Sequence, residues 1–236
     1  MEQLKTTSGK PIIQVKDLKK VYIMGRERVV ALKNINLEIM QGEICCIFGT
    51  SGSGKSTLLN QLAGLEKPTK GVVKIGGIPI SLLDENRLAA FRQDHLGFVF
   101  QSYNLLGELT ALENVAMPLM FKGVPKEIRD MQARKMLHRV GLADRINHFP
   151  NQMSGGQQQR VGIARAFVTH PEVVFADEPT GNLDSKTTKE VMAMIRDFAH
   201  KFNQTIVMVS HDPEMTEYAD RIVTLVDGVI VSNVTK

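Results

Sequence analysis

A glycine-rich stretch, IFGTSGSGKST at residues 47–57, restricts the possible folds of this chain more than any other feature. Residues 49–56 fit the pattern G-x-x-x-x-G-K-[ST] in full, after an apolar run and before a segment with helical spacing. Glycine lets the backbone wrap closely around an anion, and successive N–H groups then point inward at the positive end of the helix. The stretch therefore predicts a phosphate-binding loop (P-loop) between a strand and a helix. The candidate phosphate contacts are Gly49, Thr50, Ser51, Gly52, Ser53, Gly54, Lys55, Ser56 and Thr57.

Two carboxylates follow a second apolar run, VVFADE at residues 173–178. A P-loop protein anchors Mg²⁺ with a carboxylate from a neighbouring buried strand, and Asp177 fits that position. The Ser56 hydroxyl is the other candidate Mg²⁺ ligand. Glu178 lies one residue beyond the run, where a carboxylate is suited to act as general base toward a water. The alternatives are a glycine-rich turn that binds nothing and a strand that ends in two solvated acids.

The rest of the pattern predicts an α/β fold whose sheet is interrupted by a helical segment. Residues 12–48 contain β-branched runs (IIQVKDL, INLEIM and EICCIF) that indicate strands of an N-terminal sheet. Hairpins are expected in GVVKIGGIPI, with the turn at Gly76-Gly77, and in RIVTLVDGVIVS, with the turn at Asp227-Gly228. Strands are expected at VVFA and TIVMVS, with a helix between them. From about residue 84 to residue 169 the pattern is mostly helical. The expected inner faces of two helices are Ala133, Met136, Leu137 and Val140, and Val191, Met194, Ile195, Phe198 and Phe202.

Composition narrows the class of protein. Of 236 residues, 43% are hydrophobic and 23% charged, typical of a folded soluble domain, and no run approaches the ~20 apolar residues of a membrane-spanning helix. The net charge of +4 is not gathered in a dense Lys/Arg run, so we expect no nucleic-acid partner. The start, MEQLKTTSGK, lacks the apolar core of a secretory signal. Cys45 and Cys46 are adjacent in an apolar run, which favours buried packing residues in a reducing compartment.

A second glycine-containing turn occurs in MSGGQQQR, residues 153–160, directly before the helical run VGIARAF. Ser154, Gly155 and Gly156 would present backbone amides at a helix N-terminus, as the first loop does. With these motifs in this order, the chain resembles the ATP-binding subunit of ABC transporters over nearly its whole length. MSGGQ matches the signature of that family, which usually has Leu in place of Met153.

The resemblance implies roles for residues that are weak signals alone. Gln101 in FVFQSYN corresponds to the glutamine that senses Mg²⁺ and the γ-phosphate, and is a further metal candidate. His211 in VMVSHD corresponds to the histidine that contacts the γ-phosphate and joins Glu178 as a catalytic candidate. Asp184 in GNLDS takes the D-loop position, and Tyr22 in KKVYIMG matches the aromatic that stacks on adenine. In isolation, Tyr22 could also be an ordinary strand aromatic and Gln101 could merely begin a loop, while His211 would more often be a structural histidine.

The fold that the resemblance implies is a P-loop NTPase core with an N-terminal antiparallel β subdomain and an inserted α-helical signature subdomain. We expect one ABC ATPase domain over residues 1–236, with a catalytic core at about 1–84 and 170–236 and the helical subdomain at 85–169. The implied cofactors are ATP and Mg²⁺. The implied assembly is a head-to-tail homodimer, in which the Ser154–Gln157 turn of one copy closes on the γ-phosphate held by the other.

The longer matches FQSYNLL, LTALENVAMPL, FPNQMSGGQQQRVGIARA and ADEPTGNLDS are most similar to the LolD/MacB/FtsE-type group. In that group the ATPase is a separate chain paired with a permease, in lipoprotein release, macrolide or peptide export, or cell-division signalling. The resemblance implies a membrane permease partner, a position on the cytoplasmic face of the membrane, and room for an accessory extracytoplasmic protein. The apolar segment 102–123 is expected beside the groove that receives the permease. The chain departs from the group in its paired cysteines and in Thr50, where Pro is common.

Two other functions remain open at this point. ABC ATPases of DNA repair or translation usually carry a long coiled coil, zinc-binding cysteines or two fused cassettes, and the sequence contains none of these. A metabolic P-loop kinase would leave MSGGQ and His211 unexplained. We therefore expect an enzyme that hydrolyses ATP to ADP and phosphate and drives export or mechanotransmission through its partner.

Overall fold

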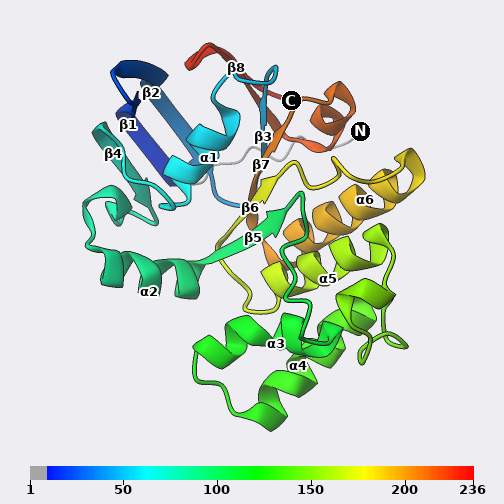
Figure 1. Cartoon of the computed structure of the whole chain (residues 1–236). Helices are drawn as coiled ribbons and strands as arrows, with labels where there is room; N and C mark the ends of the chain where they lie inside the picture. Colours follow the sequence, from blue (N-terminus) through cyan, green and yellow to red (C-terminus); the bar gives the residue numbers. More distant parts are fainter. Residues whose placement is uncertain (1–9) are drawn as a thin grey trace.

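Two sheets organise the chain, and the computed structural model describes them over residues 10–236. The smaller sheet is antiparallel, with the strand order β2-β1-β4, and lies at the upper left of Figure 1. Its strands are β1 (Pro11–Met24), β2 (Glu27–Met40) and β4 (Lys70–Ile75). This sheet is the N-terminal antiparallel subdomain expected from the sequence. The first nine residues, on which the inference about a secretory signal depends, lie outside the described range.

The larger sheet has the strand order β5-β6-β7-β3-β8-β9. Its strands are β3 (Ile44–Phe48), β5 (Leu96–Phe100), β6 (Val173–Asp177), β7 (Thr205–Ser210), β8 (Arg221–Val226) and β9 (Val229–Thr235). Neighbouring strands are parallel except β8 and β9, which form the hairpin expected at Asp227-Gly228. Because parallel strands end at the same edge, the loops after β3, β5, β6 and β7 meet there.

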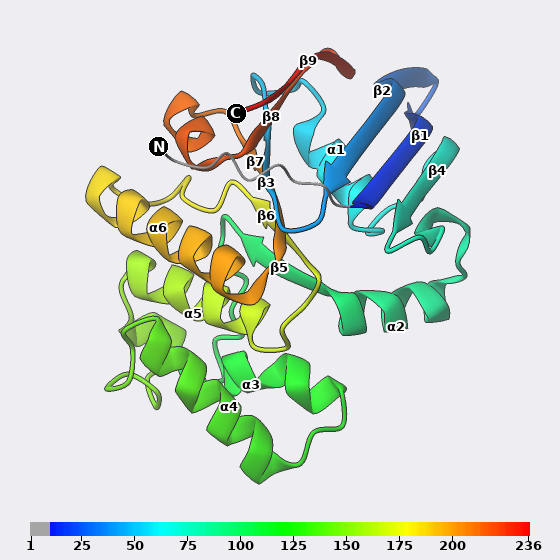
Figure 2. The ribbon, with the colours of Figure 1, turned by 180° about the vertical axis from the view of Figure 1, so that it is seen from behind.

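Helices cover both faces of the larger sheet. They are α1 (Lys55–Leu62), α2 (Glu85–His95), α3 (Ala111–Phe121), α4 (Lys126–Arg139), α5 (Gly155–Phe167) and α6 (Ser185–Phe202), with short 3-10 turns at Ile80–Leu82, Pro150–Gln152 and Pro213–Tyr218. Figures 1 and 2 show α5 and α6 along one face, α3 and α4 beyond α5, and α1 between the two sheets. Over residues 10–236, no helix has the length and apolar character needed to cross a membrane.

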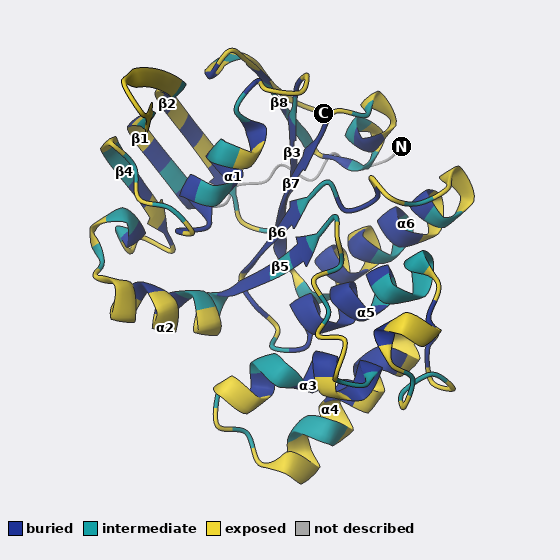
Figure 3. Cartoon of the chain, viewed as in Figure 1, coloured by how far each residue is buried: buried dark blue, intermediate teal, exposed yellow. Residues whose placement is uncertain are grey.

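Two apolar cores lie on opposite faces of the larger sheet, whose inner strands β3, β6 and β7 are largely buried in Figure 3. Successive side chains of a strand point to opposite faces of the sheet, so neighbouring residues belong to different cores. In β6, Ala176 packs in the core under α3 to α6, and Phe175 packs in the core shared with the smaller sheet. Cys46 and Cys45 divide in the same way, and both are free and buried, as expected. The predicted inner face of α4 is buried throughout; in α6, Met194 and Phe202 are only partly buried.

Two expectations about the sheets are corrected. EICCIF forms β3, an inner strand of the larger sheet and not part of the N-terminal sheet, because alternation identifies a strand but not its neighbours. The interval 85–169 is mostly helical, as expected, and also contains the short strand β5, which pairs with β6. Gly76 and Gly77 turn the chain with positive φ, but the strand expected after them is a single bridge between Ile75 and Ile78.

Candidate active site

The glycine-rich stretch forms a tight loop between β3 and α1. The Ser53 N–H donates to the Thr50 carbonyl at 3.2 Å. Gly52 and Gly54 have φ values of 79° and 102°, a region that favours glycine. At Gly49, a Cβ would lie 2.3 Å from a backbone carbonyl oxygen of β8, so no larger residue fits there. The loop geometry therefore requires glycine at these positions.

Buried donors in this loop lack the partners that a phosphate would supply. No side chain caps α1, and its first turn has no acidic residue, so its first amides are available to an anion. Lys55 is buried and its Nζ donates to the Thr50 carbonyl at 2.8 Å, but among residues 10–236 it joins no ion pair. The Ser53 hydroxyl is also buried without a hydrogen-bond partner. The loop thus fits a phosphate group, which would neutralise the ammonium.

Asp177 ends β6 beside the P-loop and accepts a 3.3 Å hydrogen bond from Ser56 Oγ. Burial raises the pKa of the Asp177 carboxyl and Glu178 adds to the increase, while the Ser56 hydrogen bond and the Lys55 charge oppose it. In the part of the chain that the structure describes, no group of three or more His, Cys, Asp or Glu side chains could hold a metal ion. The hydroxyl of Ser56 and the carboxylate of Asp177 are neighbouring oxygen donors, which fit an Mg²⁺ ion that takes its other ligands from a bound phosphate and water.

Glu178 is held in a strained conformation beside the same loop. Its φ of 42° is in the left-handed region, which few residues other than glycine adopt. Its N–H donates to the Val209 carbonyl of β7 at 3.2 Å, and its Oε1 lies 2.9 Å from His211 Nδ1. Together with P-loop residues and residues of β2, Glu178 lines a cavity of about 550 Å³. Strain of this kind persists only where the surroundings over-determine it, and it is frequent at active sites.

Gln101 follows β5 and contacts the loop after β6. A Cβ on Gly181 would lie 2.6 Å from Gln101 Nε2, and Asn182 Nδ2 donates to the Gln101 carbonyl at 3.0 Å. Gln101 and His211 are therefore at the same sheet edge as the P-loop and Asp177, although neither lines the 550 Å³ cavity. The fold brings together residues from four separate strands.

The Ser154–Gln157 turn lies outside that cavity. The Gln157 N–H donates to Ser154 Oγ at 3.3 Å and the Ser154 N–H donates to Gln157 Oε1 at 3.0 Å, a capping box that begins α5. Ser154 is exposed, and no residue of the turn lines the P-loop cavity. Asp184 caps α6, and hydrogen bonds from the Thr187 hydroxyl, at 2.6 Å, and the Thr187 backbone hold the pKa of Asp184 below its usual value.

Tyr22 is not among the residues that line the cavity. Its hydroxyl donates to Glu66 Oε2 at 2.7 Å, and Lys20 Nζ lies 5.0 Å from the ring centroid. The apolar lining comes instead from Val29 and Val30 of β2, which the sequence reasoning missed. The available signal was an apolar pair in the strand that returns directly after Tyr22. The role of Tyr22 toward adenine stays a prediction.

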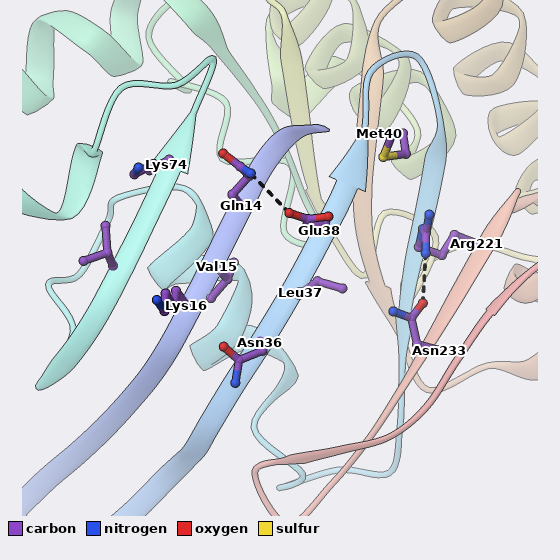
Figure 4. A pocket seen from close by; sticks show the side chains of 11 residues that line it. Gln14, Val15, Lys16, Asn36, Leu37, Glu38, Met40, Lys74, Arg221 and Asn233 are labelled. Carbon is purple, nitrogen blue, oxygen red and sulfur yellow. Dashed lines mark hydrogen bonds between the residues drawn. The ribbon is translucent and has the colours of Figure 1, made fainter. Parts of the chain in front are cut away.

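A larger hollow, of about 800 Å³, lies on the outer face of the smaller sheet beside β8 and β9 (Figure 4). Four of its polar side chains bond in pairs: Gln14 Nε2 donates to Glu38 Oε1, and Arg221 Nη1 donates to Asn233 Oδ1, each at 3.2 Å. No glycine loop or helix N-terminus opens into it. Size alone therefore does not make it the nucleotide site.

Comparison with known proteins agrees with this geometry. The ABC transporter family model matches residues 32–181, which include the P-loop, the Ser154–Gln157 turn and Asp177–Glu178. The chain belongs to the ABC transporter family. It is 50% identical over 225 residues to an ABC transporter ATP-binding protein of Methanocaldococcus jannaschii, a match that covers 95% of this chain and 100% of the relative. It is 48% identical over 219 residues to an ABC transporter ATP-binding protein of Thermotoga maritima, covering 93% of each.

Another relative is longer than this chain. The macrolide export ATP-binding/permease protein MacB of Vibrio parahaemolyticus is 46% identical over 222 residues, covering 94% of this chain but only 34% of MacB. Among solved structures, the ATP-binding cassette MJ0796, a dimer in a post-hydrolysis state with ADP and Pi, superposes with a TM-score of 0.88 at 44% identity, over 94% of this chain and 98% of the cassette.

These comparisons confirm the α/β P-loop NTPase fold and the family expected from the sequence. The chain is an ATP-binding and ATP-hydrolysing subunit of the ABC transporter type, similar to MacB and to the MJ0796 cassette. Neither the family description nor these relatives support the alternative of an ATPase for DNA repair or translation.

Proposed function

We propose that this subunit hydrolyses ATP at a site completed by a second copy of the chain. The chain has two turns that could bind an anion, the P-loop and the Ser154–Gln157 turn, which is called the second anion turn below. The observation that carries the proposal is their separation: the P-loop lines a cavity with Glu178, whereas the Ser154–Gln157 turn is outside it. One copy would thus hold a nucleotide at one place and offer its second turn to another molecule. The dimeric state of the MJ0796 cassette supports closure between two copies.

In this proposal the P-loop amides and Lys55 hold the β- and γ-phosphates. Ser56 and Asp177, together with Gln101, hold the Mg²⁺ ion. When bound, Mg²⁺ neutralises charge that develops on the phosphates during transfer. These roles are supported by the burial of Lys55, which forms no ion pair within residues 10–236, and by the 3.3 Å contact between Ser56 and Asp177.

Glu178 would take the proton of the attacking water, and His211 would orient its carboxylate from the 2.9 Å contact seen here. From the second copy, the Ser154–Gln157 turn would donate its amides to the γ-phosphate, and Asp184 would lie at the same interface. Tyr22 would have to exchange its contact with Glu66 for the adenine ring.

The work of the subunit is proposed to pass to a membrane permease. MacB is named as an ATP-binding/permease protein, and this chain aligns with only 34% of its length. This supports a permease that is a separate protein in the case of this chain. The proposed docking place is a groove of about 380 Å³ lined by Met117, Pro118 and Phe121 among others; Phe121 is 63% exposed. Residues 1–236 would act there as one ABC ATPase domain, with 85–169 as its helical subdomain.

This arrangement would place the subunit at the cytoplasmic face of the membrane, with an accessory extracytoplasmic protein reached only through the permease. The test is affinity purification of the full chain from detergent-solubilised membranes, followed by identification of the co-eluting proteins. We expect a multispanning permease, and its recovery should fall when Phe121 is replaced by Asp. Co-elution of a soluble DNA-repair protein in place of a permease would contradict the proposal.

A further inference from the structure

Arg165 is a buried cation that the hydrolysis site does not use. It lies on α5 with 8% of its surface exposed, and burial lowers the pKa of its guanidinium. Within residues 10–236, no carboxylate pairs with it. Burying a charge without an opposite charge is costly, and an apolar residue would pack the same helix face at lower cost. Stability alone therefore does not account for arginine here.

The two hydrogen bonds of Arg165 go to consecutive backbone carbonyls. Its Nη1 donates to the Asn104 carbonyl at 2.5 Å and its Nη2 donates to the Tyr103 carbonyl at 2.9 Å. Tyr103 and Asn104 have φ values of 60° and 47°, so two neighbouring residues other than glycine are in the left-handed region. The planar guanidinium has the fork geometry to hold both carbonyls at once. Arg165 thus fixes a strained turn two residues after Gln101.

The same turn contacts the start of α5. A Cβ on Gly155 would lie 2.7 Å from the Tyr103 hydroxyl oxygen, and a Cβ on Gly162 would lie 3.7 Å from the Tyr103 carbonyl oxygen. Tyr103 therefore lies along α5, with its backbone near Arg165 and its ring end against the Ser154–Gln157 turn. Figure 1 shows the chain crossing α5 between β5 and α3.

Arg165 also lines the 380 Å³ groove beside α3, together with Asn104, Met117 and Phe121. One side chain thus contacts the groove, the turn after Gln101 and, through Tyr103, the second anion turn.

We propose that Arg165 is a positioning residue that couples occupancy of this groove to the placement of the Ser154–Gln157 turn, by holding the carbonyls of Tyr103 and Asn104. The inference rests on the proposed dimeric site, because the turn acts on the nucleotide of the other copy. Arg165 does not line the P-loop cavity. Its loss should therefore weaken closure between copies and leave nucleotide binding by each copy unchanged.

The test compares Arg165→Lys and Arg165→Met with the control Arg92→Lys. Arg92 lines the same groove, but its Nη1 donates to the Gly64 carbonyl at 2.7 Å, whereas the hydrogen bonds to the Tyr103 and Asn104 carbonyls come from Arg165. For each full-length variant, kcat and KM for ATP hydrolysis, ATP affinity by calorimetry and the thermal unfolding midpoint are measured. ATP-dependent dimerisation is measured in a Glu178→Gln background, where hydrolysis is slow.

We expect ATP affinity to match the wild type and kcat to fall roughly 2- to 30-fold, the range produced by mutations within coupled networks. The loss should be larger for Met, which keeps neither hydrogen bond, than for Lys, which keeps one. If Arg165 had only a structural role, both variants would lower the unfolding midpoint, but kcat and dimerisation would not fall further in the Met variant than in the Lys variant. Wild-type kcat and dimerisation in both Arg165 variants, or an equal loss in Arg92→Lys, would overturn the inference.

A second variant covers the case in which the Arg165 variants do not fold. Tyr103→Phe keeps the carbonyl that Arg165 holds and removes only the hydroxyl at Gly155. It should weaken dimerisation with ATP affinity unchanged, and full dimerisation would count against the inference. Failure of the proposed function itself is distinguishable, because the wild-type chain would then show no ATP-dependent dimer.

Discussion

Replacing Glu178 with glutamine separates the chemistry at this position from its structural role. Glutamine has nearly the same size, so it can keep the φ of 42° and the contact between the Glu178 N–H and Val209. The substitution leaves Lys55 and Ser56 untouched. It replaces the carboxylate, one oxygen of which lies 2.9 Å from His211, with a non-basic amide, so a water at the γ-phosphate would have no carboxylate to accept its proton.

We expect ATP affinity to stay close to that of the wild type and turnover to fall at least ~100-fold, the lower end of what a general base contributes. That factor corresponds to about 2.7 kcal/mol in the activation free energy. The assay is phosphate release at saturating ATP, with affinity measured separately by calorimetry. Glu172→Gln is the matched control, because Glu172 Oε1 lies 2.8 Å from His95 Nδ1 and forms a similar pair at the opposite end of β6.

Near-normal turnover in Glu178→Gln would remove Glu178 from the role of general base. A joint loss of turnover and ATP affinity would show instead that the carboxylate supports the P-loop. An equal loss in Glu172→Gln would mean that the pairing with histidine matters for folding and not for chemistry.

Lys55→Ala should abolish tight nucleotide binding because it removes the buried ammonium; retained affinity by calorimetry would contradict the P-loop assignment. Asp177→Asn should raise the thermal unfolding midpoint of the nucleotide-free protein at neutral pH. Because the pKa of Asp177 is raised in the folded state, the unfolded chain loses this proton at lower pH, and the free energy of unfolding falls as pH rises from the unfolded to the folded pKa. Asparagine carries no charge and avoids this loss, so an unchanged midpoint would refute the reasoning. Cys45 and Cys46 should react with iodoacetamide only after unfolding, since burial raises the pKa of Cys46 to about 12, and labelling of the native protein would show otherwise.

Local patterns in the sequence were sufficient for most helices and turns. The spacing of Ala133 and Met136 identified the buried face of α4, and Asp227-Gly228 identified a hairpin, because both signals depend on neighbours along the chain. The P-loop could be predicted for the same reason. The place of Asp177 beside the P-loop followed from the need for a carboxylate at the end of a neighbouring buried strand, and the structure has Asp177 at the end of β6.

Which strands lie side by side, and which side chains meet across the fold, could not be predicted from the sequence. Nothing in EICCIF indicates that β3 lies between β7 and β8, and LGFVF follows α2 without the polar break that marks a strand. The contact between Glu178 and His211 depends on a left-handed backbone that no local pattern demands. Arg165 was missed because a charge in a helix is usually solvated; the available signal was its position among buried neighbours such as Ile163 and Phe167.

The central claim is that ATP closes two copies of this chain around a shared site, and light scattering after size exclusion tests it most directly. With Glu178→Gln and ATP, the mass should be that of two chains; with ADP, it should be that of one. Ser154→Arg in the same background should restore the mass of one chain with ATP, since the turn is exposed in the single copy. A single-chain mass at saturating ATP, or a dimer that persists equally with ADP and with Ser154→Arg, would contradict the account.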